Sequence, residues 1–285
     1  MISVFDRAQI KRQRIRNAHH KDNQFLFNWA MAQIEERLSV VRRKFPVCVR
    51  IGARGPGLPA DTYGIVTQTT MDVSGADIAA EEEFFPFAPQ SLDLVVSALS
   101  LHTVNDLPGA LLQIRQSLKP DGLFVAAILG GETLHELRQC LAEAELEIMG
   151  GLSPRVAPFA DKPQMGNLLQ RAGFSLPVID SDIVTVTYDS IFPLMRDLRQ
   201  MGEGNALLER RKTFTPRSVF LRAGNLYAER FSEPDGRILA SFEVIFLIGW
   251  SPHDSQQKPQ RRGSATTNLA EFLGTEEIGA GEKPN

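Results

Sequence analysis

Few residues in this sequence have the types and spacing that catalysis or metal binding requires. The five histidines are scattered along the chain, and Cys48 and Cys140 each lie in an apolar stretch, so neither residue type forms a ligand set. Ser153 and Ser264 lack the strand-turn-helix context of a hydrolase nucleophile. His102 follows a predicted buried strand, where it can act as an acid or base or fill a structural role. We therefore expect no metal site, and no residue set defines a catalytic group.

The elements that must position these side chains alternate between strands and helices. Buried strands are predicted at 47–51, 92–97 and 122–128, because each is a short and nearly continuous apolar run. A helix separates the last two of these strands, and Asp106 can cap its first turn. Strands and helices in this order predict right-handed crossovers and a doubly wound α/β sheet.

The second half of the chain departs from a minimal α/β sheet. Residues 176–187 alternate as a strand, residues 189–230 are mainly helical, and residues 241–250 form a strand again. We expect this last strand to be antiparallel, and the helical insertion at 189–230 to cover a cleft at the ends of the other strands. The predicted parts of the chain are a helical segment at 1–45, an α/β domain at 46–250 and a flexible tail at 251–285.

Charge is distributed unevenly, although the formal net charge is only −3. Residues 1–50 carry eleven lysines and arginines against four acids, whereas residues 61–83 carry six acids and no lysine or arginine. Two solvated surfaces that attract each other would explain this pattern, and so would a basic arm that binds an acidic partner. With this overall balance the protein has no net positive charge that would attract nucleic acid, so we expect no nucleic-acid partner.

The sequence also bears on the compartment. No stretch approaches the roughly 20 apolar residues of a membrane span, and the first residues lack the apolar core of a signal peptide. Cysteines without paired spacing are typical of reduced cytosolic thiols. We expect a cytoplasmic protein with no membrane span.

Several motifs resemble those of known protein families. Residues 81–87, 91–97, 100–102 and 118–122 are similar to the middle motifs of class I S-adenosylmethionine-dependent methyltransferases. A narrower set resembles the methyltransferase-like assembly factors of respiratory complex I, and the similarity extends from about Val4 to Ala265. This set comprises GGETL at 130–134, GLSP at 151–154, MGE at 201–203, IGW at 248–250 and RGSA at 262–265.

The resemblance implies a Rossmann-like methyltransferase fold and a site for S-adenosylmethionine. In that fold a glycine-rich loop after the first strand lets backbone N–H groups approach the cofactor, and an acid after the second strand meets its ribose. Glu81 matches the position that meets the adenine amino group, although it could equally be an exposed acid. The residues assigned to the cofactor site are Gly52, Gly55, Gly57, Asp72, Glu81, Glu82, Ser97, Leu99 and His102.

The loop after the first strand departs from the family pattern. Arg50 stands where the family has an acid, and Arg54 and Pro56 stand where it has glycines. A guanidinium in place of a carboxylate repels a cationic cofactor, and a proline removes an N–H donor. Alternatively, Gly55 and Gly57 restore the turn in a shifted register.

The chain is also short between the first strand and the acidic run. A full front end needs about 50 residues, whereas only 29 positions separate Gly52 from Glu81. At least one helix must be missing or reduced to a turn. We expect the second strand at 64–68, without a carboxylate at its end, and Asp72 as the nearest substitute. From these departures we predict that S-adenosylmethionine binds poorly or not at all.

Three functions remain open on the sequence alone. The resemblance implies an assembly factor that binds a complex I subunit and hydroxylates one of its arginines. A working S-adenosylmethionine-dependent methyltransferase of a small molecule or protein is the second possibility. The third is a pseudoenzyme that uses the fold as a binding surface. The altered loop favours the first or the third, and no residue set in the sequence defines a hydroxylase site.

Overall fold

The computed structural model describes residues 3–17, 24–257, 263–264 and 266–275. The chain divides into two compact units, Met1–Pro252 and His253–Asn285. The first contains the sheet, and the described part of the second contains the short helix α9 (Leu269–Leu273). Arg262 and Ala265 of the motif at 262–265 lie outside the described residues, and the flexibility expected for 251–285 stays a prediction.

Seven strands in the described part of the chain form a single sheet. Their bounds are β1 (Val47–Ile51), β2 (Thr67–Asp72), β3 (Ile78–Ala79), β4 (Leu92–Ala98), β5 (Leu118–Leu129), β6 (Ser175–Tyr188) and β7 (Ile238–Trp250). Their order across the sheet is β3-β2-β1-β4-β5-β7-β6. Neighbouring strands from β3 to β5 are parallel, which confirms the predicted doubly wound arrangement.

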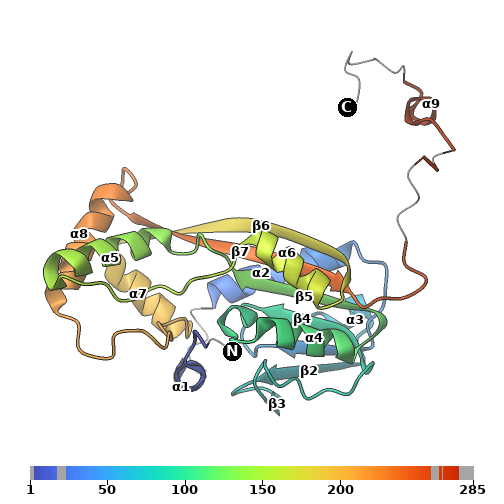
Figure 1. The fold of residues 1–285 in the computed structure, drawn as a ribbon, viewed down its shortest axis with the longest axis horizontal. Helices are drawn as coiled ribbons and strands as arrows, with labels where there is room; N and C mark the ends of the chain where they lie inside the picture. Colours follow the sequence, from blue (N-terminus) through green and yellow to red (C-terminus); the bar gives the residue numbers. More distant parts are fainter. Residues whose placement is uncertain (1–2, 18–23, 258–262, 265, 276–285) are drawn as a thin grey trace. The chain divides into compact units, whose positions relative to one another are not determined.

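The last two strands form a long antiparallel hairpin at one side of this sheet. β7 pairs antiparallel with β5, from Leu123 opposite Trp250 to Leu129 opposite Val244. It also pairs antiparallel with β6 over most of its length. The predicted antiparallel final strand is therefore confirmed, and Figure 1 shows β6 and β7 running side by side.

Helices cover both faces of the sheet. α2 (Phe25–Ser39) and α5 (His135–Met149) share one hydrophobic layer with α7 (Ile191–Gln200) and α8 (Arg217–Arg230), whereas α4 (Leu107–Ser117) and α6 (Lys162–Arg171) pack on the other face. In β4, Leu94 and Val96 belong to the first layer and Val95 to the second. Burial on both faces explains why this strand is an unbroken apolar run. Figure 1 shows α5, α7 and α8 grouped at one end of the view.

Local sequence signals account for two features of this arrangement. Asp106 caps α4 as predicted, because its carboxylate accepts a hydrogen bond from the Gly109 N–H at 3.0 Å. α7 and α8 lie between β6 and β7, so the predicted helical insertion is also confirmed. No helix in the described residues is long and apolar enough to span a bilayer.

The front end of the sheet is truncated, as predicted, but its second strand lies later than expected. Between β1 and β2 the chain forms only the four-residue helix α3 (Ala60–Tyr63). β2 then begins at Thr67, which pairs with Val47 of β1, rather than covering 64–68. The prediction that this strand ends without a carboxylate is wrong, because Asp72 is its last residue.

Candidate functional site

The carboxyl ends of β1, β2 and β4 meet at one edge of the sheet, where open α/β folds bind their ligands. Gly52 follows β1 with a φ of +93°, a conformation that suits glycine, and an added Cβ there would lie 3.5 Å from Cβ of Ser100. Asp72 ends β2, and Leu99 follows β4. The structure thus brings these predicted residues to one place.

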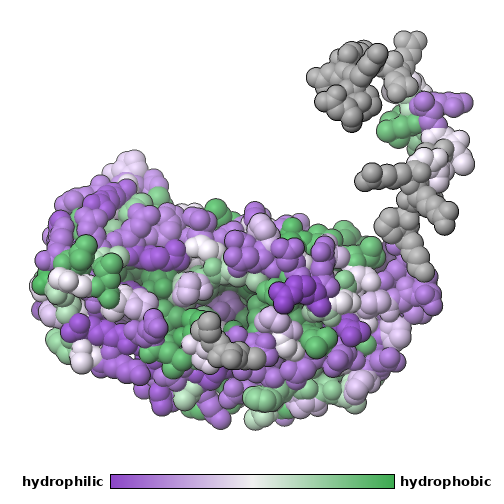
Figure 2. Space-filling model, in the orientation of Figure 1, coloured by the Kyte–Doolittle hydropathy of each residue, from purple (hydrophilic) through white to green (hydrophobic). Residues whose placement is uncertain are grey.

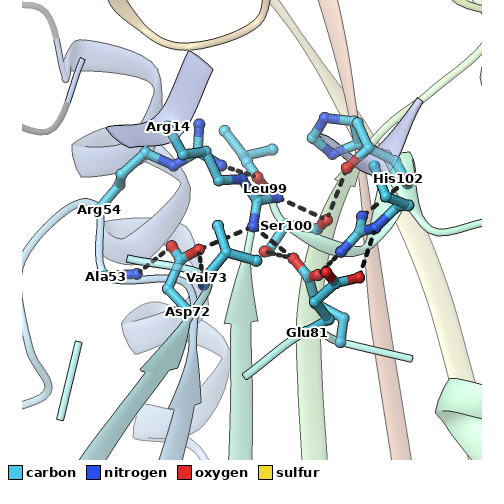
Figure 3. A network of polar contacts seen from close by, with 12 residues as sticks. Arg14, Ala53, Arg54, Asp72, Val73, Glu81, Leu99, Ser100 and His102 are labelled. Atoms are coloured by element: carbon cyan, nitrogen blue, oxygen red, sulfur yellow. Dashed lines mark hydrogen bonds and ion pairs between the residues drawn. The ribbon is translucent and has the colours of Figure 1, made fainter. Parts of the chain in front are cut away.

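A buried cluster of charges occupies this edge, shown in Figure 3. Its cation is Arg14 of α1 (Arg7–Asn17), whose side chain is 5% exposed. Arg14 Nη1 donates to Asp72 Oδ1 at 2.9 Å and to Glu82 Oε1 at 2.6 Å. Ser100 contributes two contacts, because its carbonyl oxygen lies 3.5 Å from Arg14 Nη2 and its hydroxyl donates to Glu82 at 2.7 Å. An N-terminal helix therefore supplies the charge that neutralises two predicted site residues.

A second arginine of the same helix completes the cluster. Arg7 Nη2 donates to Glu82 Oε2, and Arg7 Nη1 donates to the carbonyl of Thr103 at 3.1 Å. Arg7 also approaches Glu81 at 3.4 Å, but the Glu81 side chain is 36% exposed whereas that of Glu82 is 1% exposed. Of the two neighbouring acids, Glu82 is therefore the buried member of the site, and Glu81 lies at its rim.

Electrostatics within the cluster favour the charged forms. Burial alone would raise the pKa of the Glu82 carboxyl, but the nearby guanidinium groups of Arg14 and Arg7 hold this pKa far below its ordinary value. Burial would likewise lower the pKa of Arg14, and the carboxylates of Glu82 and Asp72 raise it above its ordinary value instead. The cluster is thus a tightly coupled set of ion pairs removed from water.

Arg54 builds a second ion-pair group beside the first. Arg54 Nη2 donates to the carbonyl of Leu99 at 2.9 Å, and Arg54 Nη1 donates to the carbonyl of Met201 at 2.9 Å and to Glu203 at 2.8 Å. Its guanidinium carbon also lies 4.1 Å from the ring centroid of Phe27. Arg54 therefore ties the loop after β1 to the end of β4 and to the segment after α7.

Glu203 also contacts the histidine singled out from the sequence. Glu203 Oε2 lies 3.0 Å from His102 Nε2, and the His102 ring packs edge-on against Phe159. Burial would raise the pKa of Glu203, but His102 and Arg54 outweigh it and hold this pKa at about 2. The expectation that the insertion covers the cleft is confirmed at His102, because Glu203 belongs to the insertion.

The loop after β1 does not carry the charge effect predicted for Arg50. Arg50 Nη1 donates to the carbonyls of Gly55 and Pro56, so this arginine braces the loop. The Gly55 N–H donates to Gln24 at 3.0 Å. Gly55 has a φ of +76°, a conformation that suits glycine, and a Cβ at Gly57 would lie 3.0 Å from the Gln68 amide nitrogen. Gly55 therefore allows a turn here, but its N–H already has a partner within the protein.

The remaining predicted residue, Ser97, is fully buried near the end of β4. Its hydroxyl oxygen has no hydrogen-bond partner among the described residues.

Sequence reasoning did not identify Arg7, Arg14 or Glu203 as members of the site. Two features of the sequence pointed toward these residues. They are the opposite charges of 1–50 and 61–83, and the motif at 201–203. Attraction between the two charged segments is confirmed, but the expectation that both are solvated is wrong for Arg14 and Glu82.

Two cavities adjoin residues of the site. A polar cavity of about 390 Å³ is lined by Arg14, Arg54 and Asp72 among other residues. A mainly apolar cavity of about 260 Å³ lies under the insertion, and both Glu203 and Met201 line it. Met201 lines both cavities. Figure 2 shows a hollow with hydrophobic residues around it near the middle of the visible face.

In this conformation the residues do not fit S-adenosylmethionine. The Asp72 carboxylate, which would meet the ribose, already accepts hydrogen bonds from Arg14, the Val73 N–H at 2.7 Å and the Ala53 N–H at 3.0 Å. The side chains of Arg14 and Arg54 occupy the same edge, so the cofactor would have to displace them from their carboxylate and carbonyl partners. Among the described residues, no three His, Cys, Asp or Glu side chains are placed to hold a metal ion.

Comparison with known proteins defines the class of fold. A family model described as a methyltransferase domain matches residues 65–126. The solved structure of a putative methyltransferase from Bacillus halodurans C-125 aligns with a TM-score of 0.50 and 14% identity, covering 78% of this chain and 99% of that one. Together with the strand order, these matches define a Rossmann-like methyltransferase fold.

Sequence relatives narrow the class to a family. Arginine-hydroxylase NDUFAF5, mitochondrial, of Danio rerio is 38% identical over 289 residues, covering 95% of this chain and 90% of that protein. The protein of the same name from Mus musculus is 40% identical over 302 residues, covering 99% and 87%. A malonyl-[acyl-carrier protein] O-methyltransferase from Xylella fastidiosa (strain M23) is 39% identical but covers 61% of this chain and 57% of that protein. The chain belongs to the family of the NDUFAF5 arginine hydroxylases.

Proposed function

We propose that this chain acts in the assembly of respiratory complex I by hydroxylating an arginine of one subunit. The observation that carries the proposal is the alignment with proteins named arginine hydroxylases along 95% to 99% of the chain. The aligned length takes in the helical insertion, which a minimal methyltransferase sheet does not need. The motif resemblance points to a complex I subunit as the partner.

The site geometry agrees better with this proposal than with methyl transfer. Methyl transfer requires bound S-adenosylmethionine, and in this conformation Arg14 and Arg54 occupy the edge where that cofactor would sit. The altered loop adds to this difficulty, because its Gly55 N–H is already used by Gln24. We therefore infer that S-adenosylmethionine binds weakly or not at all while α1 is in place.

A methyltransferase remains the second candidate, and one observation favours it. Asp72 stands at the end of β2, the position of the ribose-binding acid in this fold. If Arg14 withdrew, this carboxylate would become available to a cofactor.

A cytoplasmic location also stays a prediction, which fractionation of cells that express the tagged chain would test.

Mass mapping of arginines in the partner subunit tests the proposal. Complex I would be isolated from cells with and without this chain, and its arginine-containing peptides compared. We expect one arginine to carry the mass of one added oxygen atom only when the chain is present. An added methylene unit would favour the methyltransferase instead, and an unchanged arginine together with a copurifying chain would favour a pseudoenzyme.

A matched pair of variants separates site chemistry from mere presence of the protein. Glu203→Gln removes the anion that contacts Arg54 and His102 at the cleft. Glu209→Gln makes the same chemical change at a nearby exposed position. The modification should be reduced by Glu203→Gln and unchanged by Glu209→Gln. Equal modification by both variants would show that the described cleft is not involved.

A further inference from the structure

The Arg14 guanidinium is enclosed by acceptors in the manner of a bound ligand. Asp72, Glu82 and the Ser100 carbonyl surround it, at distances of 2.9, 2.6 and 3.5 Å. All three groups accept hydrogen bonds, and a guanidinium carries only donors, arranged in a planar fork. The three acceptors come from β2, from the acidic run before β4 and from the turn after β4. The pocket is thus part of the sheet domain, whereas its occupant comes from α1.

α1 is held by Arg7 and Arg14, by Ile10 and by the residues just before it. Of its residues, Ile10 and Arg14 are buried, and the others are exposed or partly exposed. Ile10 packs in a small apolar cluster with Phe5, Ala206 and Leu207. Arg12 bonds to Gln9 within the helix. Arg7 and Arg14 therefore attach the helix to the sheet domain, while the residues before it attach to the insertion, where Phe5 pairs with Leu207 and Asp6 forms an ion pair with Arg210 at 2.9 Å.

Charge balance shows what the pocket requires. Asp72 and Glu82 are 3% and 1% exposed, and Arg14 and Arg7 supply their counter-charges. Without α1, the neighbouring carboxylates of Asp72 and Glu82 would lose these counter-charges, which is unfavourable. The pocket therefore favours another cation when α1 is displaced. Both carboxylates accept from Arg14 Nη1, and the Ser100 carbonyl lies 3.5 Å from Nη2, so the three acceptors are spread over two nitrogens of the planar guanidinium. An ammonium, which is a compact point charge, has only one nitrogen to offer.

The surroundings leave room for such a ligand. Arg14 and Asp72 line the polar cavity of about 390 Å³. Thr103, whose carbonyl accepts from Arg7, lines the apolar cavity of about 260 Å³ together with Phe5. A side chain in the place of Arg14 would thus have one cavity beside its guanidinium, with a second near the position of Arg7. The pocket of Arg14 therefore adjoins an existing cavity.

We propose that the pocket of Asp72, Glu82 and Ser100 binds the guanidinium of a partner protein's arginine, and that Arg14 fills it until that arginine displaces it. This inference rests on the proposed function and identifies where the substrate side chain is held. Arg14 then acts as an intramolecular competitor. A tethered group competes at an effective concentration in the millimolar range, so free arginine compounds bind the wild-type chain weakly.

Binding of a small arginine compound to the full-length chain tests this assignment. The probe is Nα-acetyl-L-arginine amide, with the corresponding lysine amide as its matched control. In Arg14→Ala the pocket is vacated, and calorimetry should show binding of the arginine amide about tenfold or more tighter than in the wild type. The arginine amide should also raise the Tm of this variant more than the lysine amide does. Arg12→Ala, on the exposed side of the same helix, should behave as the wild type.

Other outcomes overturn the assignment. Equal affinity of Arg14→Ala for the arginine and lysine amides would mean that the pocket does not recognise a guanidinium. Tight binding of S-adenosylmethionine to Arg14→Ala, without binding of the arginine amide, would assign the pocket to the cofactor. If Arg14→Ala fails to fold, Arg14→Lys keeps the charge, and the arginine amide should bind it more tightly than it binds the wild type. Absence of that difference would contradict the proposal.

The mass mapping of the partner subunit keeps the two proposals distinguishable. A hydroxylated arginine in the partner, without binding of the arginine amide to Arg14→Ala, would leave the function standing and refute the pocket. Binding of the amide without any modified arginine would leave the pocket standing and refute the hydroxylase.

Discussion

Arg14 and Arg54 bring positive charge into the edge of the sheet that binds ligands in this fold. Arg14 and its partner Glu82 are buried, whereas Arg54 and its partner Glu203 are partly buried, with side chains 15% and 13% exposed. A charge removed from water is tolerated only when it is paired and hydrogen-bonded. The site is therefore stable as it stands, and any ligand that displaces an arginine must replace its contacts.

The Glu203 carboxylate should make stability depend on pH. Its folded-state pKa of about 2 lies below the ordinary value of 4.5, so the charged form stabilises the fold. This contribution is fully present above pH 4.5 and is lost as pH falls toward 2. Glu203→Gln should lower the free energy of unfolding by about 2–4 kcal/mol at neutral pH. Urea unfolding at a series of pH values would measure the difference from the wild type, which should shrink below pH 4.5.

Glu209→Gln is the control for this experiment, since Glu209 is exposed. It should change stability by less than about 0.5 kcal/mol at every pH. A destabilisation by Glu203→Gln that stayed constant down to pH 2 would contradict the assigned pKa, because it would show that the charge of Glu203 is not what stabilises the fold.

At the residue scale, the sequence predicted the charges but not their pairing. Opposite charge on 1–50 and 61–83 correctly indicated attraction, yet Arg14 and Asp72 are 58 positions apart. Nothing in the spacing identifies which arginine meets which acid. Burial was also missed, because charge runs usually mark solvated surfaces. The folded edge of the sheet buries these groups by bringing distant segments together.

At the scale of elements, β2 shows why the strand with the ribose acid was misplaced. Its sequence, TQTTMD, is polar, and its first four residues are exposed or partly buried. β2 lies next to the edge strand β3. A search for apolar runs therefore favoured 64–68 as the strand. In the structure the strand covers Thr67–Asp72, so a carboxylate stands at its end.

The helical insertion was easier to predict. We expect apolar packing to hold it on the sheet. Leu226 of α8 is 1% exposed and lies in the hydrophobic layer shared with α5. Leu226→Ala should destabilise the protein by about 2–4 kcal/mol, since it removes buried methyl groups and leaves a cavity. Arg230 of the same helix forms an ion pair with Glu143 at 2.7 Å, but both side chains are more than a third exposed. Chemical denaturation of Leu226→Ala and of Arg230→Ala would compare the contribution of packing with that of the surface ion pair.

Arg230→Ala serves as the matched control on α8 and should destabilise the protein much less than Leu226→Ala, because an exposed ion pair contributes little to stability. A larger loss from Arg230→Ala than from Leu226→Ala would mean that ion pairs, and not the apolar layer, hold the insertion on the sheet.

At the scale of the whole molecule, the topology could be predicted because its strong signals are local. The apolar runs of β1, β4 and β5, the helices between them and the late strand β7 each follow from a short segment. The docking of α1 at the ligand edge could not be predicted in this way. It depends on ion pairs between distant segments and on a mostly polar helix that has no strong apolar face. The family is established by relatives that align with nearly the whole chain, because the fold alone does not determine it.

The protein's own arginines occupy the edge of the sheet where the cofactor of a methyltransferase fold would sit. Calorimetric titration of the full-length wild-type chain with S-adenosylmethionine would show whether they exclude it. A micromolar site is worth about −8 kcal/mol, and separating Arg14 from its buried carboxylates costs about 3–5 kcal/mol. We therefore predict affinity at least about 100-fold weaker than micromolar. Low-micromolar binding by the unaltered chain would contradict the account and restore an ordinary methyltransferase.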